Sequence, residues 1–454
     1  ALLCALITTV SIAQINHKAQ DTTTQKVTTL DEVIVTGNLK TDPIHTIVTN
    51  KYDETIVQPK NVADLFNDIN GFSVIKRGNY AIDPSFRASQ YEQLNVQYDG
   101  GTKAMHACPN RMDPITTHVI PEEISKIEII KGPYTVRYGA TFGGIVNLVT
   151  QKPNYLDKGF HGKASAGYET NGNSMVNMLQ LQYIEDKYDI VGNVGYRDFG
   201  SYEDGNGVET PSSFRSTDYG VKLGYNFTDN QRLQAHWRQS FGRDVQHAAL
   251  MMDTEYDDSS ILSLDYKISD LGETVKSFSA KAYYSYVDHL MTNFERPSFV
   301  RMAAESSVES TTIGGKIELN WQPAKNVTVF SGLDAMNIAR DGGRTRTLKL
   351  NMMGMPLDMP MVFNDKVWQD SYINDYGVFT EAKWAINPTT VLTAGMRYDL
   401  VKSDIQDPEA DFAARYDLEE KTDNNVSGTA SIKRLVTDNF TLEAAYGRGV
   451  RSAN

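Results

Sequence analysis

The chain falls into two parts that differ in the periodicity of their apolar residues. From about residue 159 onwards, apolar and polar residues alternate along segments that turn residues separate, and aromatic residues lie near the segment ends. About thirteen segments have roughly the 9 to 11 residues that a tilted membrane strand needs. The pattern therefore predicts a transmembrane antiparallel β-barrel over residues 158–454. Its first four strands are expected at 164–170, 176–183, 188–196 and 219–227.

The connections between these segments indicate the same fold. After the first turn they alternate between short and long, which is typical of outer-membrane barrels and has no reason to occur in a soluble sandwich. A propeller would instead repeat about every 40 residues, and the sequence has no such repeat. Short connections lie near 185–187, 228–230, 323–326, 387–388 and 437–439, and long ones cover roughly 199–215, 242–258, 289–308, 341–366 and 401–423.

Residues 44–157 have a mixed pattern that predicts a compact α/β unit. Residues 61–66 have helical spacing behind an asparagine cap, and Pro121 opens a short helical turn. Strand-like runs, several of them with an adjoining turn, cover 71–75, 94–101, 127–133 and 138–150. No interior stretch of the sequence approaches the roughly 20 apolar residues of a membrane helix, which excludes a helical membrane protein.

The N-terminal residues predict export. Residues 1–13 form a short apolar run that ends in small residues, which is typical of a signal peptide without its basic start. Residues 14–43 are a polar, flexible lead-in with one β-prone island at 30–36. This island is either a short edge strand or a strand held ready for donation to a partner's sheet. Its residues are Leu30, Asp31, Glu32, Val33, Ile34, Val35 and Thr36.

The other end of the chain bears on the completeness of the barrel. Residues 445–454 read as a strand that runs into a loop, with no partner segment to close the sheet. An unpaired strand edge in lipid would leave backbone polar groups unsatisfied. We therefore expect the sequence to be a fragment that lacks the final strands of the barrel.

Charge and residue content narrow the classes of function. The formal net charge of −13 argues against a nucleic-acid-binding protein and is compatible with a surface that attracts cations. The sequence offers no recognisable nucleophile–base pair and no paired acids, so an enzyme is not expected.

Two short sulfur-containing motifs carry the candidate chemistry. Cys108 and Met112 form a C-x₃-M motif, and His289 and Met291 form an H-x-M motif far along the chain. One thiolate, one imidazole and two thioethers make a soft ligand set of the kind that selects copper, as Cu(I) or Cu(II). Each residue also has an ordinary alternative: a buried thiol, a loop histidine or a packing methionine.

Local geometry is expected to favour the two motifs as ligand pairs. Proline is common at a first helical position, so a helical turn beginning at Pro109 would place Cys108 and Met112 on one face. A thiol at a helix N-terminus also forms its thiolate more easily. His289 and Met291 are two residues apart, so on a strand they point the same way.

Further candidate ligands surround these motifs. Met105 and His106 precede Cys108, and His106 is a possible fifth ligand. The segment 351–361 holds five methionines, and the alternation of connections places it in a long outer loop. It is either a Cu(I)-binding loop or an apolar lid folded over the N-terminal unit. The five methionines are Met352, Met353, Met355, Met359 and Met361.

Taken together, these segments resemble the TonB-dependent outer-membrane receptors. Residues 30–36 are similar to the TonB box, which the family presents to the periplasmic energy-transducing protein TonB. Residues 61–153 are similar to the plug domain, notably in Ile127–Pro133 and Gly143–Asn147. The resemblance implies a plug inside a 22-stranded barrel embedded in outer-membrane lipid, of which about thirteen strands are present here.

Within that family, the two sulfur-containing motifs resemble those of the TonB-dependent copper receptors. The resemblance implies that Cys108, Met112, His289 and Met291 are copper ligands and that the protein imports copper. Two other functions stay open. An iron–siderophore receptor would line its pocket with aromatic residues and arginine and would need no thiolate. A binding or adhesion barrel that docks a copper protein or a phage would need the outer loops but not Cys108.

Overall fold

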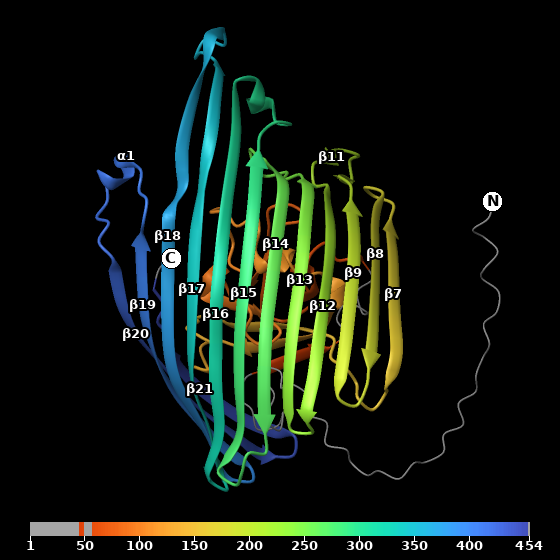
Figure 1. Ribbon diagram of the computed structural model, residues 1–454, viewed down its shortest axis with the longest axis vertical. Coiled ribbons are helices and arrows are strands. Elements are labelled where there is room, and N and C mark those ends of the chain that lie inside the picture. Colours follow the sequence, from red (N-terminus) through yellow and green to blue (C-terminus); the bar gives the residue numbers. More distant parts are fainter. Residues whose placement is uncertain (1–44, 50–56, 453–454) are drawn as a thin grey trace, which may run out of the picture.

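The computed structural model describes residues 57–452 and the backbone of residues 45–49 (Figure 1). The predicted signal peptide, the lead-in and the segment 30–36 lie outside the described residues. A tall curved sheet forms the wall of the molecule, and the N-terminal residues, orange in Figure 1, lie on its inner side. In the part of the chain that is described, no helix has the length and apolarity needed to cross a membrane.

The wall is one antiparallel sheet of thirteen strands, as predicted. Strands consecutive in the sheet are consecutive in the chain, apart from a small hairpin of β10 (Tyr202–Glu203) and β11 (Glu209–Thr210). The edge strands β7 and β21 do not pair with each other within the described residues. The strands are β7 (Gly159–Glu169), β8 (Ser174–Ile184), β9 (Tyr188–Phe199), β12 (Phe214–Thr228), β13 (Gln231–Val245), β14 (Asp253–Ser269), β15 (Val275–Thr292), β16 (Met302–Ala324), β17 (Val327–Leu350), β18 (Pro356–Asn387), β19 (Thr390–Ile405), β20 (Lys421–Thr437) and β21 (Phe440–Arg448).

The burial pattern of the wall is the reverse of that in a soluble protein. Along β8, buried and exposed residues alternate strictly. The outward positions include Leu179 and Leu181, whereas the inward positions include the buried amides Gln180 and Gln182. An apolar outer face with a polar interior is the pattern of a membrane barrel.

Several strands are longer than the 9 to 11 residues predicted. β17 has 24 residues and β18 has 32, and only the tight turn 351–355 separates them. The prediction of a long loop over 341–366 is therefore wrong. The two strands stay paired because β-prone and charged residues continue to match across them, as where Arg346 forms an ion pair with Asp365 at 2.7 Å. The resulting hairpin rises above the neighbouring strands (Figure 1).

The N-terminal unit is built on a four-stranded sheet in the order β1-β5-β6-β4 and a separate β2–β3 hairpin. Its strands are β1 (His45–Thr49), β2 (Phe72–Lys76), β3 (Ile82–Phe86), β4 (Leu94–Tyr98), β5 (Ile124–Lys131) and β6 (Gly144–Thr150). The two helical segments expected here form the 3₁₀ turns η2 (Val62–Phe66) and η5 (Pro121–Glu123). Two further 3₁₀ turns, η3 (Tyr91–Gln93) and η4 (Ile115–Thr117), were not predicted. Asn61 caps η2 by accepting a hydrogen bond from the Ala63 N–H at 2.8 Å.

Buried ion pairs join this unit to the wall. Glu123 accepts a hydrogen bond from Arg238 of β13 at 2.6 Å, and Arg137 contacts Glu318 of β16. Burial raises the pKa of Glu123 to about 7, even though Arg238 opposes that effect. Paired charges of this kind are costly to separate in a buried place, so they fix how the inner unit sits against the wall.

Candidate metal centre

Cys108 lies in a loop of the inner unit between β4 and η4. The loop turns where the Arg111 N–H donates to the Cys108 carbonyl at 2.8 Å, and Arg111 has a left-handed backbone with φ of +56°. No helix begins at Pro109, so the expectation of a helical turn there is wrong. The left-handed conformation of Arg111 ends the turn before a helix can form. The expectation that a helix N-terminus favours the thiolate therefore does not apply to Cys108.

Asp113 holds the shape of this loop from inside. Its carboxylate accepts hydrogen bonds from the backbone N–H groups of Ala107 and Cys108, the latter at 3.1 Å. Burial raises the pKa of Asp113, and neighbouring His289 and the Ala107 N–H act in the opposite direction. The side chain satisfies two buried donors next to Cys108 and so orients that residue.

The wall holds the same loop from outside. Trp368 of β18 donates from its indole N–H to the Ala107 carbonyl at 2.6 Å. Arg340 of β17 donates to the His106 carbonyl at 2.9 Å and lies over the Trp368 ring at 5.1 Å. Contacts from both sides thus hold the backbone of residues 106–108 that carries the Cys108 side chain.

His289 and Met291 lie near the upper end of β15 and both face inward. Buried residues alternate along this part of the strand, and His289 is fully buried. The Met291 sulfur lies 3.8 Å from the Cys108 sulfur. Cys108, Met112 and Met291 belong to one buried cluster. The structure thus brings together the segments of Cys108 and His289, which lie 181 residues apart in the sequence.

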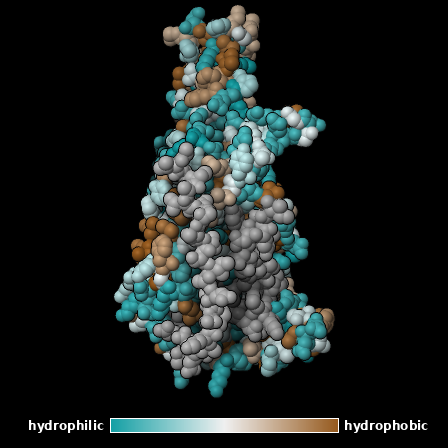
Figure 2. Space-filling model, turned by 90° about the vertical axis from the view of Figure 1, so that its right-hand side faces the viewer, coloured by the Kyte–Doolittle hydropathy of each residue, from teal (hydrophilic) through white to brown (hydrophobic). Residues whose placement is uncertain are grey.

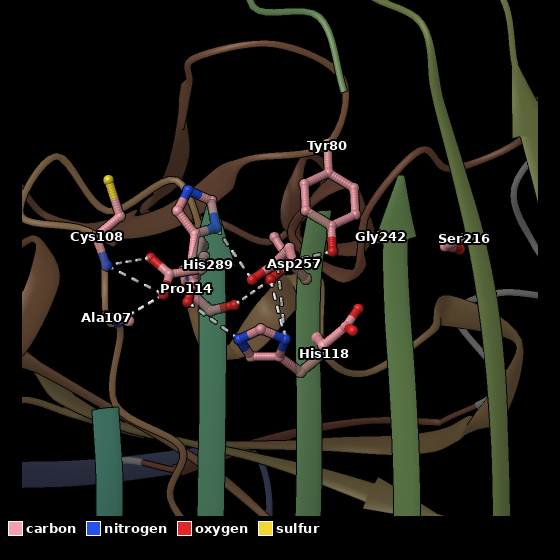
Figure 3. A network of polar contacts seen from close by, with 12 residues as sticks. Tyr80, Ala107, Cys108, Pro114, His118, Ser216, Gly242, Asp257 and His289 are labelled. Carbon is pink, nitrogen blue, oxygen red and sulfur yellow. Dashed lines mark hydrogen bonds and ion pairs between the residues drawn. The ribbon is translucent and has the colours of Figure 1, made fainter. Parts of the chain in front are cut away.

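The imidazole of His289 completes this group. Figure 3 shows its ring beside the Cys108 side chain. Nδ1 lies 3.2 Å from a carboxylate oxygen of Asp257. Nε2 is buried and makes no hydrogen bond with any of the described residues. An imidazole nitrogen in that state is suited to receive a metal ion.

Met105 and His106 are directed elsewhere. Both line a separate cavity of about 150 Å³, whose lining does not include Cys108. The His106 ring lies 3.0 Å from the Arg111 guanidinium. Burial and the nearby Arg111 charge hold the pKa of His106 well below its ordinary value. The structure therefore does not bring these two candidates to the Cys108 cluster.

The five methionines of 351–361 are also distant from the cluster. They lie at the tip of the β17–β18 hairpin and are exposed, with Met352 at 93% and Met353 at 83% exposure. Figure 2 shows hydrophobic surface (brown) at this upper end of the molecule. The tip projects away from the inner unit, so the interpretation of this segment as a lid is wrong. The segment is the turn of a paired hairpin and not a loop over the inner unit.

Two buried residues next to the site were not predicted from the sequence. Asp257 lies beside His289, and His118 approaches Asp257. Met252 also packs against the cluster, from the connection after β13. Asp257 lies directly opposite His289 in the cross-strand register, which the sequence pattern alone does not fix. Nothing in the local pattern around His118 distinguishes it from a core histidine.

Two family models match the chain. One is described as "TonB dependent receptor-like, beta-barrel" and matches residues 193–454. The other is described as "TonB-dependent Receptor Plug Domain" and matches residues 39–145. Together they cover the inner unit and most of the wall.

Solved structures share the fold at low sequence identity. The copper transporter OprC is 24% identical with a TM-score of 0.77, and the match covers 89% of this chain and 63% of that one. The FrpB iron transporter from Neisseria meningitidis (F3-3 variant) is 16% identical with a TM-score of 0.67, covering 88% and 64%. The ferric citrate transporter FecA is 15% identical with a TM-score of 0.69, covering 88% and 62%. The chain thus spans less than two thirds of each of these structures.

These matches account for both parts of the molecule: a plug domain, and a β-barrel wall on whose inner side the plug lies. The chain belongs to the TonB-dependent receptor family.

Proposed function

We propose that this protein is an outer-membrane receptor that binds and imports copper. The ligands are Cys108 and Met112 from the plug and His289 and Met291 from the barrel. The observation that carries the proposal is the approach of the Cys108 and Met291 sulfurs to 3.8 Å beside the unpartnered His289 Nε2. Two sulfurs bound tetrahedrally to one ion at about 2.3 Å would be about 3.8 Å apart.

The chemistry of this set favours copper over the hard cations. A thiolate and two thioethers are soft donors, whereas magnesium and calcium require oxygen ligands. A single imidazole adds a donor that suits both copper oxidation states. The surrounding cluster is apolar, which excludes water and strengthens the attraction between a cation and the thiolate.

The division of the site between two domains supports a route for release. Copper enters from the upper side and joins the plug loop to β15. When TonB engages residues 30–36 and remodels the plug, Cys108 and Met112 move away from His289 and Met291. Each half then keeps two ligands, too few for tight binding, and the ion leaves towards the periplasm.

An iron–siderophore receptor is the second candidate. The cavity that Met105 and His106 line is rich in arginine and tyrosine, as such a pocket would be. Three of its four arginines are paired with carboxylates, however. Arg397 lies 2.6 Å from Asp334, and Arg137 and Arg111 contact Glu318 and Glu92. Because these charges are neutralised, they leave little attraction for an anionic chelate, and copper is the better proposal.

A barrel that docks a copper protein or a phage is the third candidate. The exposed methionines of the β17–β18 tip would suit a docking surface. Such a barrel would not need a buried thiol between plug and wall, so the Cys108 cluster counts against it. We propose transport and no catalytic role.

Replacing Val33 with proline tests whether copper is imported through TonB. Proline removes a backbone donor, so it blocks strand pairing of residues 30–36 with the partner. We expect copper uptake by cells to fall to the level of a strain without TonB, while copper binding by the purified receptor is unchanged. Replacing Thr23 with proline is the control, because Thr23 lies outside residues 30–36. A loss of both uptake and binding would show that the segment is structural.

Replacing all five tip methionines with leucine tests the hairpin as an accessory copper site. The change keeps size and apolarity but removes the thioether sulfur. If the tip captures Cu(I), we expect uptake to fall several-fold at limiting copper and to be unchanged at saturating copper. Met175→Leu with Met396→Leu on the outer barrel face is the matched control. Equal uptake at every copper concentration would remove the hairpin from the pathway.

A further inference from the structure

The position of the His289 ring is set by the neighbouring strand. Asp257 of β14 lies directly opposite His289 in the antiparallel register. One oxygen of its carboxylate lies 3.2 Å from Nδ1. A carboxylate there favours the tautomer with the proton on Nδ1, which leaves the lone pair of Nε2 free. Nε2 is the atom without a partner, on the side of the ring that faces Cys108 (Figure 3).

The other oxygen of Asp257 is bound to the plug. Tyr80 donates its hydroxyl hydrogen to this oxygen at 2.8 Å. His118 of the plug approaches the same oxygen at 3.9 Å. Tyr80 is 3% exposed and the other residues of this group are fully buried. A chain of contacts therefore runs from the plug through a barrel carboxylate to a barrel ligand.

Tyr80 reaches Asp257 because the barrel wall leaves a place for its ring. Gly242 of β13 lies against the Tyr80 hydroxyl, and a methyl group at this position would overlap it. The Tyr80 ring also packs on Phe214 of β12, with ring centroids 5.4 Å apart. The hydroxyl therefore has one fixed position while the plug is seated in the barrel.

A second metal site at the same place is a weaker interpretation. Oxygen atoms of Asp113 and Asp257 and a nitrogen of His289 lie within 4.8 Å of one another. The carboxylates are already used, however. Asp113 accepts from two backbone N–H groups, and Asp257 accepts from Tyr80 and His289. Side chains that have their partners are better explained as supports for a neighbouring site.

We infer that Asp257 is a positioning residue, and that the plug residue Tyr80 holds it in place so that His289 presents Nε2 to the metal. The inference rests on the proposed copper site and adds the way in which the barrel half of that site depends on the plug. When the plug moves, Cys108 and Met112 leave the metal directly. Tyr80 leaves Asp257 at the same time, and His289 then loses its fixed orientation.

The test measures copper affinity of the purified receptor by competition with a chelator of known affinity. Asp257→Asn keeps the side-chain shape, removes the charge and offers N–H donors that favour the opposite tautomer. We expect it to weaken binding about 10-fold or more, the range typical of residues that support a ligand. Tyr80→Phe, which removes one hydroxyl that contacts Asp257 and not His289, should weaken binding in the same direction by a smaller factor. Asp258→Asn is the matched control, since Asp258 pairs instead with Arg243.

Combining each variant with His289→Ala distinguishes a residue that positions His289 from one that supports the fold in general. In a His289→Ala receptor, Asp257→Asn and Tyr80→Phe should cause no further loss of affinity, because the residue they position is absent. The imidazole contribution to the X-ray absorption spectrum of bound copper should also fall in Asp257→Asn. The inference is overturned if both variants bind copper as the parent does, or if their losses persist without His289. A parent receptor that binds no copper would instead overturn the proposed function.

Discussion

Replacing Cys108 with alanine is expected to abolish tight copper binding. The thiolate is the only anionic ligand in the proposed set, and the other three donors are neutral. Loss of residues that merely support a ligand costs about 10- to 100-fold in metal affinity, so loss of the anionic ligand itself should exceed 100-fold. Chelator competition on the purified receptor measures the change.

The remaining ligands should rank below Cys108. Met291→Ala should weaken binding less, because a thioether is a neutral and often distant ligand. Met105→Ala is the matched control, since Met105 lines the separate cavity. If Cys108→Ala binds copper as the parent does, or if Met105→Ala is the more damaging change, the site is not where we propose it.

Replacing Gly144 with alanine is expected to unfold the plug inside an intact barrel. Gly144 opens β6 between Lys131 of β5 and Leu94 of β4, with φ of +130°. A methyl group there would overlap the Ile130 carbonyl oxygen and lie 2.8 Å from the Gly132 nitrogen. The obstacles are backbone atoms of a paired strand, which cannot rotate away. The backbone conformation and the overlap together should lower the free energy of unfolding of the plug by about 3 kcal/mol or more.

Urea-dependent protease resistance of the plug measures this loss, while retention of heat-modifiable gel migration shows that the barrel is intact. Gly192→Ala in β9 is the control, because a methyl group there meets no heavy atom within 4 Å. Gly192→Ala should change the free energy of unfolding by no more than about 0.5 kcal/mol. Copper binding should fall with the plug in Gly144→Ala, since the plug carries Cys108. If the plug of Gly144→Ala resists the protease as the parent plug does, β6 does accommodate a methyl group at this position and the prediction is wrong.

The wall could be predicted because its information is local. Alternation along β8, with Leu179 outward and Gln180 inward, identifies a membrane strand without knowledge of its neighbours. The tip of the β17–β18 hairpin could not be predicted in this way. Polar residues such as Arg346 and Asp365 read as loop, and only their pairing across the hairpin shows that the strands continue.

The site was predictable in part for the same reason. The motifs Cys108/Met112 and His289/Met291 are each local, and the resemblance to copper receptors linked them. Asp257 depends on the register of β14 and β15, in which Ser269 pairs with Ser277 and the same offset continues to His289. A shift of one residue would turn Asp257 to the other face, and sequence alone does not fix a register that closely.

X-ray absorption of the purified receptor loaded with one equivalent of copper tests the central claim most directly. The account predicts sulfur neighbours at about 2.3 Å or longer and one imidazole nitrogen at about 2.0 to 2.1 Å, taking the corresponding zinc distances as a guide. Cys108→Ser should remove the shortest sulfur distance and leave the nitrogen. A first shell of nitrogen and oxygen alone, or a spectrum that Cys108→Ser leaves unchanged, would contradict a copper site between the plug loop and β15.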